Sequence, residues 1–338
     1  MFSKLLHSAN LRIPGFALCL GISLIAMVAQ AGEEQFFGRP WLEALVLAIL
    51  LGTAIRTVWQ PSSNTNKGIK FCAQTLLEVA IVLLGASLSF TSIIAIGLPL
   101  LAGVILIVAV TLLLSFTLGR MLGLSPRLAT LIACGNSICG NSAIAAVAPV
   151  IGASGEDVAT SIAFTAVLGV VVVLALPILV PLLHLSSTHY GIVAGLTVYA
   201  VPQVLAATAP VSAASLQIGT LVKLIRVLML GPVILLMSQL FKSPATANPN
   251  PISSRHLLPW FILGFLAMSM LRSTNLIPQN FQPLLAETAS FLTILAMAGL
   301  GLGVDARQVA TAGPRVVATV TLSLIALCGL SLLLIRFL

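Results

Sequence analysis

Residues 133–143, ACGNSICGNSA, contain two copies of Gly-Asn-Ser and almost no bulky side chains, yet they lie at the middle of the long apolar segment 126–152. A helix that crosses a bilayer needs roughly 20 mostly apolar residues, so this segment is long enough and the motif falls near the bilayer centre. Asn136 and Asn141 are five residues apart, and on a continuous helix they would point about 140° apart. The two side chains converge only if the helix is unwound between them.

An unwound backbone at this depth indicates a cavity, because irregular backbone is tolerated in a membrane only where protein or water satisfies its polar groups. The half-helix that begins near Ser142 would direct free N–H groups and a positive dipole end into that cavity, which favours an anion. The alternative is that the small residues only allow close helix packing. The predicted binding residues of the motif are Gly135, Asn136, Ser137, Gly140, Asn141 and Ser142.

The composition places this motif in an integral membrane protein. Of the 338 residues, 59% are hydrophobic and 7% are charged, whereas roughly 25% are charged in soluble domains. About eleven apolar segments recur along the chain, and none alternates with the period of two of a barrel strand. They are 12–31, 41–58, 69–91, 94–119, 126–152, 157–183, 190–208, 212–241, 256–274, 287–304 and 312–337. The sequence therefore predicts an all-α integral membrane protein with about eleven transmembrane helices.

The basic residues predict the orientation. With a cytoplasmic N-terminus, far more Lys and Arg residues fall on the cytoplasmic side than on the other, as the positive-inside rule requires, and the C-terminus is periplasmic. The first segment ends in Ala29-Gln30-Ala31, so it is either an uncleaved anchor, which we favour, or a cleaved signal peptide. The net charge of +8 is scattered between segments, which argues against a nucleic-acid partner.

The number of segments predicts an internal repeat. Five helices in each half after the first would invert the second half relative to the first, as in inverted-repeat transporters. The expected organisation is an N-terminal helix in 1–35, one repeat in 36–185 and an inverted repeat in 186–338. In such proteins two discontinuous helices at matching positions cross near the midplane and form the binding site. We expect the second interruption at 298–304, AGLGLGV, which adds Gly299, Gly301 and Gly303 to the site.

A proline interrupts the segment 190–208. Pro202 removes a backbone donor and frees a carbonyl, close to the polar side chains of Tyr199 and Gln203. These two side chains are candidate substrate ligands, and a simple proline kink is the alternative.

Two cations lie inside the segment 212–241. Lys223 and Arg226 are three residues apart and so share one helix face. Intramembrane cations usually face a cavity or a partner, which predicts a role at the anion site, whereas a bent helix would let both snorkel to the interface. Glu78 is the buried acid expected to pair with one of them or to carry a coupling proton.

Several of these stretches resemble one known family. Residues 135–150, GNSICGNSAIAAVAPV, resemble the G-x-S-I-C-G-x-x-A-[IV] signature of the sulfate exporter family of bacterial inner-membrane proteins. The stretches 195–206, 222–229, 259–261 and 296–303 follow in the family's order. This chain has Tyr199-Ala200 where many members carry a His-Glu pair, which puts the coupling to protons in doubt.

The resemblance implies a place in the bacterial inner membrane and export of sulfate or a related oxyanion. It also implies a distant relationship to the sodium/bile-acid symporters and sodium/proton antiporters, whose two discontinuous helices cross in mid-membrane. We therefore expect a secondary transporter that exports a small anion by alternating access at crossed broken helices. The alternative is a sodium- or proton-coupled carrier of a small organic acid.

The other classes, a membrane enzyme and a non-transporting helical scaffold, are disfavoured, the scaffold because polar residues inside a span are costly. No Ser/His/Asp or paired-carboxylate set can be assembled, so no catalytic residue is expected, and the absence of a P-loop motif indicates that an ion or solute gradient drives transport. The five cysteines fall in or beside apolar segments and are interpreted as small buried hydrophobic residues, so no metal and no cofactor is expected. The expected partners are a small anion, a coupling proton or sodium ion, the lipid bilayer and a second copy of the chain.

Overall fold

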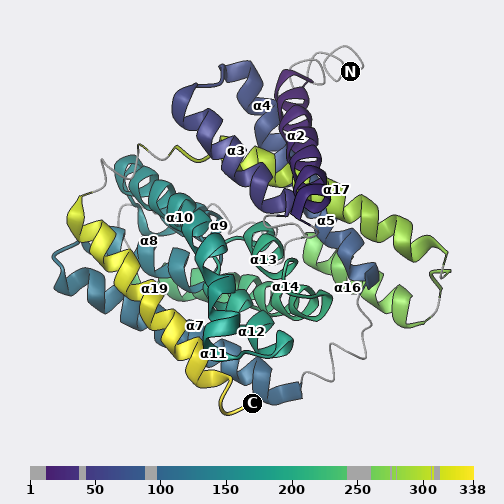
Figure 1. The fold of residues 1–338 in the computed structure, drawn as a ribbon. Helices are drawn as coiled ribbons and strands as arrows, with labels where there is room; N and C mark the ends of the chain where they lie inside the picture. The colour runs from purple at the N-terminus through teal and green to yellow at the C-terminus, as the bar shows by residue number, and fades with distance from the viewer. Residues whose placement is uncertain are drawn as a thin grey trace, which may run out of the picture. The chain divides into compact units, whose positions relative to one another are not determined.

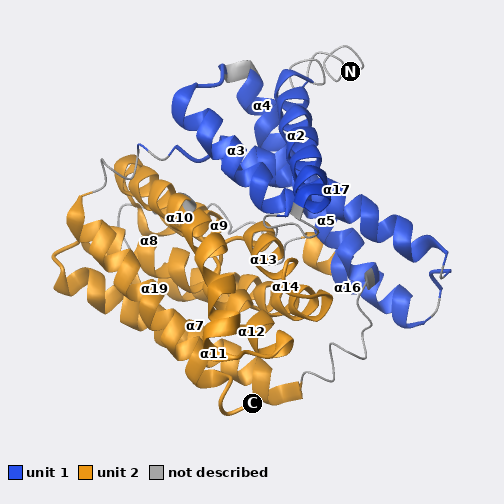
Figure 2. Cartoon of the chain, viewed as in Figure 1, with its two compact units in different colours: residues 1–91, 264–307 blue, residues 92–263, 308–338 orange. Residues whose placement is uncertain are grey.

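The structure is a computed structural model that describes residues 13–37, 43–87, 97–241, 260–274, 276–278, 280–305, 307 and 313–338. All regular secondary structure in these residues is helical (Figure 1). The chain divides into two compact units (Figure 2), and each combines segments from both halves of the sequence. Unit 1 is Met1–Thr91 with Gly264–Arg307, and unit 2 is Ser92–Leu263 with Gln308–Leu338. The predicted division into 1–35, 36–185 and 186–338 concerns an internal symmetry and stays a prediction.

Unit 1 is organised around one long helix. Its elements are α2 (Ile13–Phe37), α3 (Ala44–Val58), α4 (Ser63–Phe71), the π-helical η1 (Cys72–Leu76), α5 (Leu77–Leu84), the 3-10 turn η2 (Gly85–Ser87), most of α16 (Trp260–Ser273) and α17 (Phe281–Leu302). Helix α17 packs along α3, α5, η1 and α2. Glycine makes the approach to α3 close: a Cβ at Gly52 would lie 2.7 Å from the carbonyl oxygen of Ala298.

The prediction that the helix is interrupted at 298–304 is wrong at Gly299 and Gly301. Helix α17 is continuous through Gly299 and Gly301, and Gly303 is the residue that caps its end. A Cβ at Gly301 would overlap the carbonyl oxygen of Ile49, and one at Gly299 would lie 3.0 Å from the backbone nitrogen of Ala73. These glycines therefore allow close helix packing, which is the other physical use of small residues in a membrane protein.

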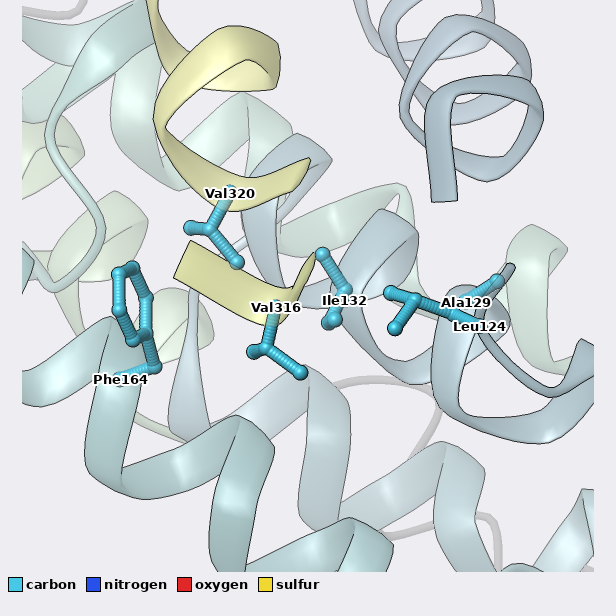
Figure 3. Close-up of a cluster of buried hydrophobic side chains, with 6 residues drawn as sticks. All are labelled: Leu124, Ala129, Ile132, Phe164, Val316 and Val320. Carbon is cyan, nitrogen blue, oxygen red and sulfur yellow. The ribbon is translucent and has the colours of Figure 1, made fainter. Parts of the chain in front are cut away.

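Unit 2 contains two helices that break in the middle. Its elements are α7 (Gly97–Met121), α8 (Pro126–Ser137), α9 (Asn141–Ile151), α10 (Gly155–Ala175), η3 (Leu176–Ile178), α11 (Leu179–Leu183), α12 (Ser187–Thr197), α13 (Val201–Thr208), α14 (Ala213–Leu228), α15 (Leu230–Leu240) and α19 (Pro314–Leu334). Helix α8 packs on α7, while α12 packs on α14 and α19. Figure 3 shows part of the apolar core, in which α8, α10 and α19 meet. Its members are Leu124, Ala129, Ile132, Phe164, Val316 and Val320.

The local sequence explains where these helices begin. The hydroxyl of Ser125 accepts a hydrogen bond from the backbone N–H of Leu128 (3.2 Å), and Pro126 occupies the first turn of α8. Both features are typical of a helix start, since Ser satisfies a free N–H group and proline has none to satisfy. Ser186 and Ser212 cap α12 and α14 in the same way, accepting from His189 and Ser215.

Six helices in the described part of the chain are long and apolar enough to cross a membrane. They run Ile13–Phe36, Gly97–Met121, Gly155–Leu183, Ala213–Leu240, Phe281–Leu302 and Pro314–Leu334. The chain is thus an all-helical integral membrane protein, as the composition predicts. Several other predicted segments correspond to short or interrupted helices: 41–58 contains α3, 126–152 contains α8 and α9, and 190–208 contains most of α12 and all of α13. The orientation and the inverted repeat stay predictions.

Candidate functional site

The first helix break lies inside the Gly-Asn-Ser repeat, as predicted. Helix α8 ends at Ser137, residues 138–140 form a turn, and α9 begins at Asn141. Gly140 adopts φ 66° and ψ −124°, a conformation that side chains with a Cβ rarely adopt. Its N–H group donates to the carbonyl of Gly135 (2.8 Å), which closes the end of α8.

The second break lies at residues 198–200, where α12 ends and α13 begins. A simple kink at Pro202, which is the alternative to a ligand site, is wrong, because the residue belongs to the first turn of α13, the position that proline favours. In a continuous helix, the N–H group of residue 202 would donate to the carbonyl of Val198. Proline has no N–H group, so this carbonyl has no partner within the helix, as expected.

The two breaks contact each other. A Cβ on Gly140 would lie only 3.2 Å from the Cβ of Tyr199, so the first turn packs directly on the second. The partner of the Gly-Asn-Ser break is therefore the Tyr199 break in the same unit. We call the residues 136–142 and 195–203 the crossing.

Lys223 and Arg226 donate hydrogen bonds to backbone carbonyls of both breaks in the crossing. Both lie in α14 and are fully buried, so the alternative that they snorkel to an interface is wrong. The Lys223 ammonium donates to the carbonyl of Ile138 (2.7 Å) in one break and to that of Val198 (2.8 Å) in the other. One side chain thus bridges two breaks that are far apart in the sequence.

Arg226 caps the two helices that end at the crossing. Its guanidinium donates to Asn136 O (2.9 Å) and Ser137 O (3.1 Å) at the end of α8, and to Gly195 O (3.0 Å) and Leu196 O at the end of α12. The last carbonyls of a helix have no partner within it, and they carry the negative end of the helix dipole. A planar guanidinium with five donors can satisfy both ends at once.

The charges at the crossing do not balance. Within the described chain, no carboxylate pairs with Lys223 or Arg226, whose recorded hydrogen bonds all go to carbonyls. Each helix C-terminus supplies roughly half a negative charge, so the ends of α8 and α12 offset about one of the two positive charges. The N-termini of α9 and α13 add positive potential of the same order. Glu78, the acid expected to pair with them, lies in α5 of unit 1.

Three buried polar atoms at the crossing have no hydrogen-bond partner in the described chain: Asn136 Oδ1, Ser137 Oγ and the Tyr199 hydroxyl. Their residues are at most 2% exposed. An unpaired buried polar group costs about 1–3 kcal/mol, so native proteins rarely leave one without a purpose. The hydroxyls of Ser137 and Tyr199 are therefore available to donate to a ligand, whereas Asn136 Oδ1 can only accept a hydrogen bond.

The remaining predicted ligands have partners of their own. Asn141 Oδ1 accepts from the hydroxyl of Thr165 (2.7 Å), and Gln203 Oε1 accepts from the N–H of Ala200 (3.1 Å), so Gln203 caps α13. Gly135 packs against Ile144 of α9, and Ser142 is exposed at the start of that helix. Gly299, Gly301 and Gly303 belong to unit 1.

The described residues hold no cluster of three or more His, Cys, Asp or Glu side chains that would suit a metal.

The carbonyls of residues 195–198 were not predicted from the sequence as hydrogen-bond acceptors for the two cations, although Pro202 marks one of them. What the crossing offers chemically is fixed positive charge, the uncapped N-terminus of α9 and the unpaired hydroxyls of Ser137 and Tyr199, which together suit a small anion.

Comparison with known proteins identifies relatives over most of the chain. A family model described as conserved hypothetical protein 698 matches residues 14–320. The chain is 60% identical over 326 residues to a UPF0324 membrane protein of Brucella melitensis, with 96% of this chain and 91% of the relative covered. It is 54% identical over 326 residues to one of Bradyrhizobium diazoefficiens (96% and 93% covered) and 36% identical over 293 residues to one of Bacillus cereus (86% and 83% covered). No solved structure matches the chain.

Proposed function

The chain belongs to the family of conserved hypothetical protein 698, the UPF0324 membrane proteins, and we propose that it is a secondary transporter of a small oxyanion such as sulfate. The anion binds at the crossing in unit 2 and moves across the bacterial inner membrane by alternating access. The direction, export, follows from the family resemblance of the Gly-Asn-Ser block.

One observation carries the proposal: two buried cations hold two helix breaks together and have no carboxylate partner in the described chain. An unbalanced charge in a low-dielectric interior is costly, and an anion removes that cost when it binds. A neutral substrate would leave the unbalanced charge as it is, and a cationic substrate would add to it. The charge therefore selects the class of substrate.

The neighbouring groups suit an oxyanion. Helices α9 and α13 begin at the crossing, and the first N–H groups of a helix have no partner within it. The hydroxyls of Ser137 and Tyr199 are unpaired and can donate to an anion oxygen. Half-helix N-termini bind anionic substrate groups in other transporters with broken helices.

Broken helices also suit alternating access. The turns at 138–140 and 198–200 interrupt the continuous helix ladder, and the side-chain hydrogen bonds of Lys223 join the two turns to each other. Small changes in these bonds are a way to expose the bound anion to one side and then to the other. An ion, proton or anion gradient supplies the driving force.

The test is exchange of labelled sulfate by the purified protein in liposomes, with sulfite, other oxyanions and small carboxylates as competitors. We expect exchange above that of protein-free liposomes, and an anion-dependent rise in melting temperature, because a ligand that binds only the folded state stabilises it. Arg226→Gln should reduce exchange roughly tenfold or more, since hydrogen bonds to charged groups contribute about 1.5–3 kcal/mol.

Arg127→Gln is the matched control, because it removes an exposed cation from α8 while leaving the crossing intact. Sodium-dependent uptake of a carboxylate that ignores sulfate would instead support an organic-acid carrier. If no oxyanion shifts the melting temperature and none is exchanged, the proposed function is wrong.

A further inference from the structure

The Lys223 ammonium occupies a position that resembles a cation site. It lies 2.7 Å from the carbonyl oxygen of Ile138 and 2.8 Å from that of Val198. These carbonyls come from two different broken helices, at the turns where the helix ladder is interrupted. In transporters with broken helices, unwound carbonyls and half-helix C-termini are the groups that coordinate a coupling sodium ion or proton.

Four further carbonyls of the crossing also accept hydrogen bonds from a buried cation. Arg226 engages the carbonyls of Asn136 and Ser137 on the first broken helix and of Gly195 and Leu196 on the second. These four carbonyl oxygens, like those of Ile138 and Val198, thus already accept hydrogen bonds from covalently attached cations. A lysine ammonium is a compact point charge with three donors, so it replaces a monovalent ion better than a planar guanidinium does.

We propose that Lys223 is a resident cation, which fills the place where a coupling sodium ion would otherwise be bound. The chain then binds and moves its anion without sodium. The flux part of this inference rests on the proposed function. The binding part does not, because it concerns only the carbonyls and the ammonium.

The inference predicts a chemical rescue. Lys223→Ala removes three methylene groups and the ammonium, which are the atoms of n-propylammonium. The variant should retain the carbonyls of Ile138 and Val198 and a cavity with the shape of the removed atoms. Free n-propylammonium should bind in that cavity. Lys223→Met is the control, because the methionine side chain fills this cavity without a charge.

The first measurement is thermal unfolding of the purified full-length protein in sodium-free buffer. We expect Lys223→Ala to melt roughly 10 °C below the unsubstituted protein, since it leaves buried carbonyls without their partner. Millimolar n-propylammonium should recover at least half of that loss, and propan-1-ol at the same concentration should recover none. Lys223→Met should respond to neither. A Lys223→Ala protein whose melting temperature ignores n-propylammonium would overturn the inference.

The second measurement uses the unsubstituted protein and so does not depend on whether a variant folds. Sulfate exchange in liposomes should be equal, within a factor of two, in sodium buffer and in N-methyl-D-glucamine buffer. Exchange that falls tenfold without sodium would refute the resident cation while supporting anion transport. Rescue by n-propylammonium in a protein that exchanges no anion would support the resident cation and refute the proposed function, so the two failures are distinguishable.

Discussion

Gly140→Ala tests the crossing most directly, because Gly140 is both the turn residue of the first break and its contact with the second. Its φ of 66° and ψ of −124° lie outside the left-handed helical region that some side chains tolerate. Holding alanine there costs about 1–3 kcal/mol. The new Cβ would also lie 3.2 Å from the Cβ of Tyr199, and overpacking of this kind costs about 1–3 kcal/mol.

Gly152→Ala is the matched control. Gly152 also has a positive φ, 62°, at the end of α9, but no atom lies within 4 Å of a Cβ built there. The left-handed conformation costs alanine about 1–2 kcal/mol. In both variants alanine also reduces the entropy of the unfolded chain, which returns about 0.4–1 kcal/mol.

The sum is a destabilisation of about 3 kcal/mol for Gly140→Ala and about 1 kcal/mol for Gly152→Ala. Since 1 kcal/mol corresponds to roughly 2–4 °C in a unit of this size, the melting temperatures should fall by roughly 6–12 °C and 2–4 °C. The assay is thermal unfolding of each purified variant with and without sulfate, and sulfate should stabilise only the control. If Gly140→Ala melts no lower than Gly152→Ala, the two breaks do not contact each other as described.

Three further substitutions separate the site from the scaffold. Ser137→Ala removes an unpaired buried hydroxyl, so the melting temperature without ligand should stay equal or rise, while sulfate affinity measured by titration should fall roughly fivefold; a large loss of stability would show that the hydroxyl has a structural partner. Tyr199→Phe removes the second unpaired hydroxyl and should give the same pattern, whereas unchanged sulfate affinity in both variants would exclude these hydroxyls as ligands. Gly301→Ala places a Cβ against Ile49 O in unit 1 and should lower the melting temperature through overpacking by about 2 kcal/mol or more, whereas Gly329→Ala, where a Cβ meets no atom within 4 Å, should be neutral; equal melting of both would refute the close packing of α17 on α3.

The first break could be predicted from the sequence because several signals agree. Ser125 and Pro126 mark the start of a helix, while Asn136 and Asn141 are too polar for the centre of an apolar segment without a reason. The prediction of the second break at 298–304 is wrong for Gly299 and Gly301, because glycine alone is an ambiguous signal. The same residue frees a backbone in a turn, as at Gly140, and lets two helices approach, as at Gly301. Only the geometry of the neighbouring helix distinguishes the two uses.

A proline gives a less ambiguous signal, since Pro202 removes a donor that a continuous helix requires. The sequence also predicts a role for Lys223 and Arg226 at the anion site, with snorkelling to the interface as the alternative that their burial excludes. It did not show that their partners are carbonyls, because every residue has a carbonyl and only the fold decides which ones lack a hydrogen bond. Long-range placement of this kind is not encoded in local spacing.

The distance along the chain between the crossing and its cations matters for biosynthesis. Lys223 follows Ile138 by 85 residues, and Arg226 follows Asn136 by 90. At about 5–20 residues per second, a ribosome takes roughly 4–18 seconds to add them. During that interval the ends of α8 cannot have their final partners, and lipid cannot replace them. We therefore expect the segment 126–152 to take its broken form only after α14 has been synthesised and inserted.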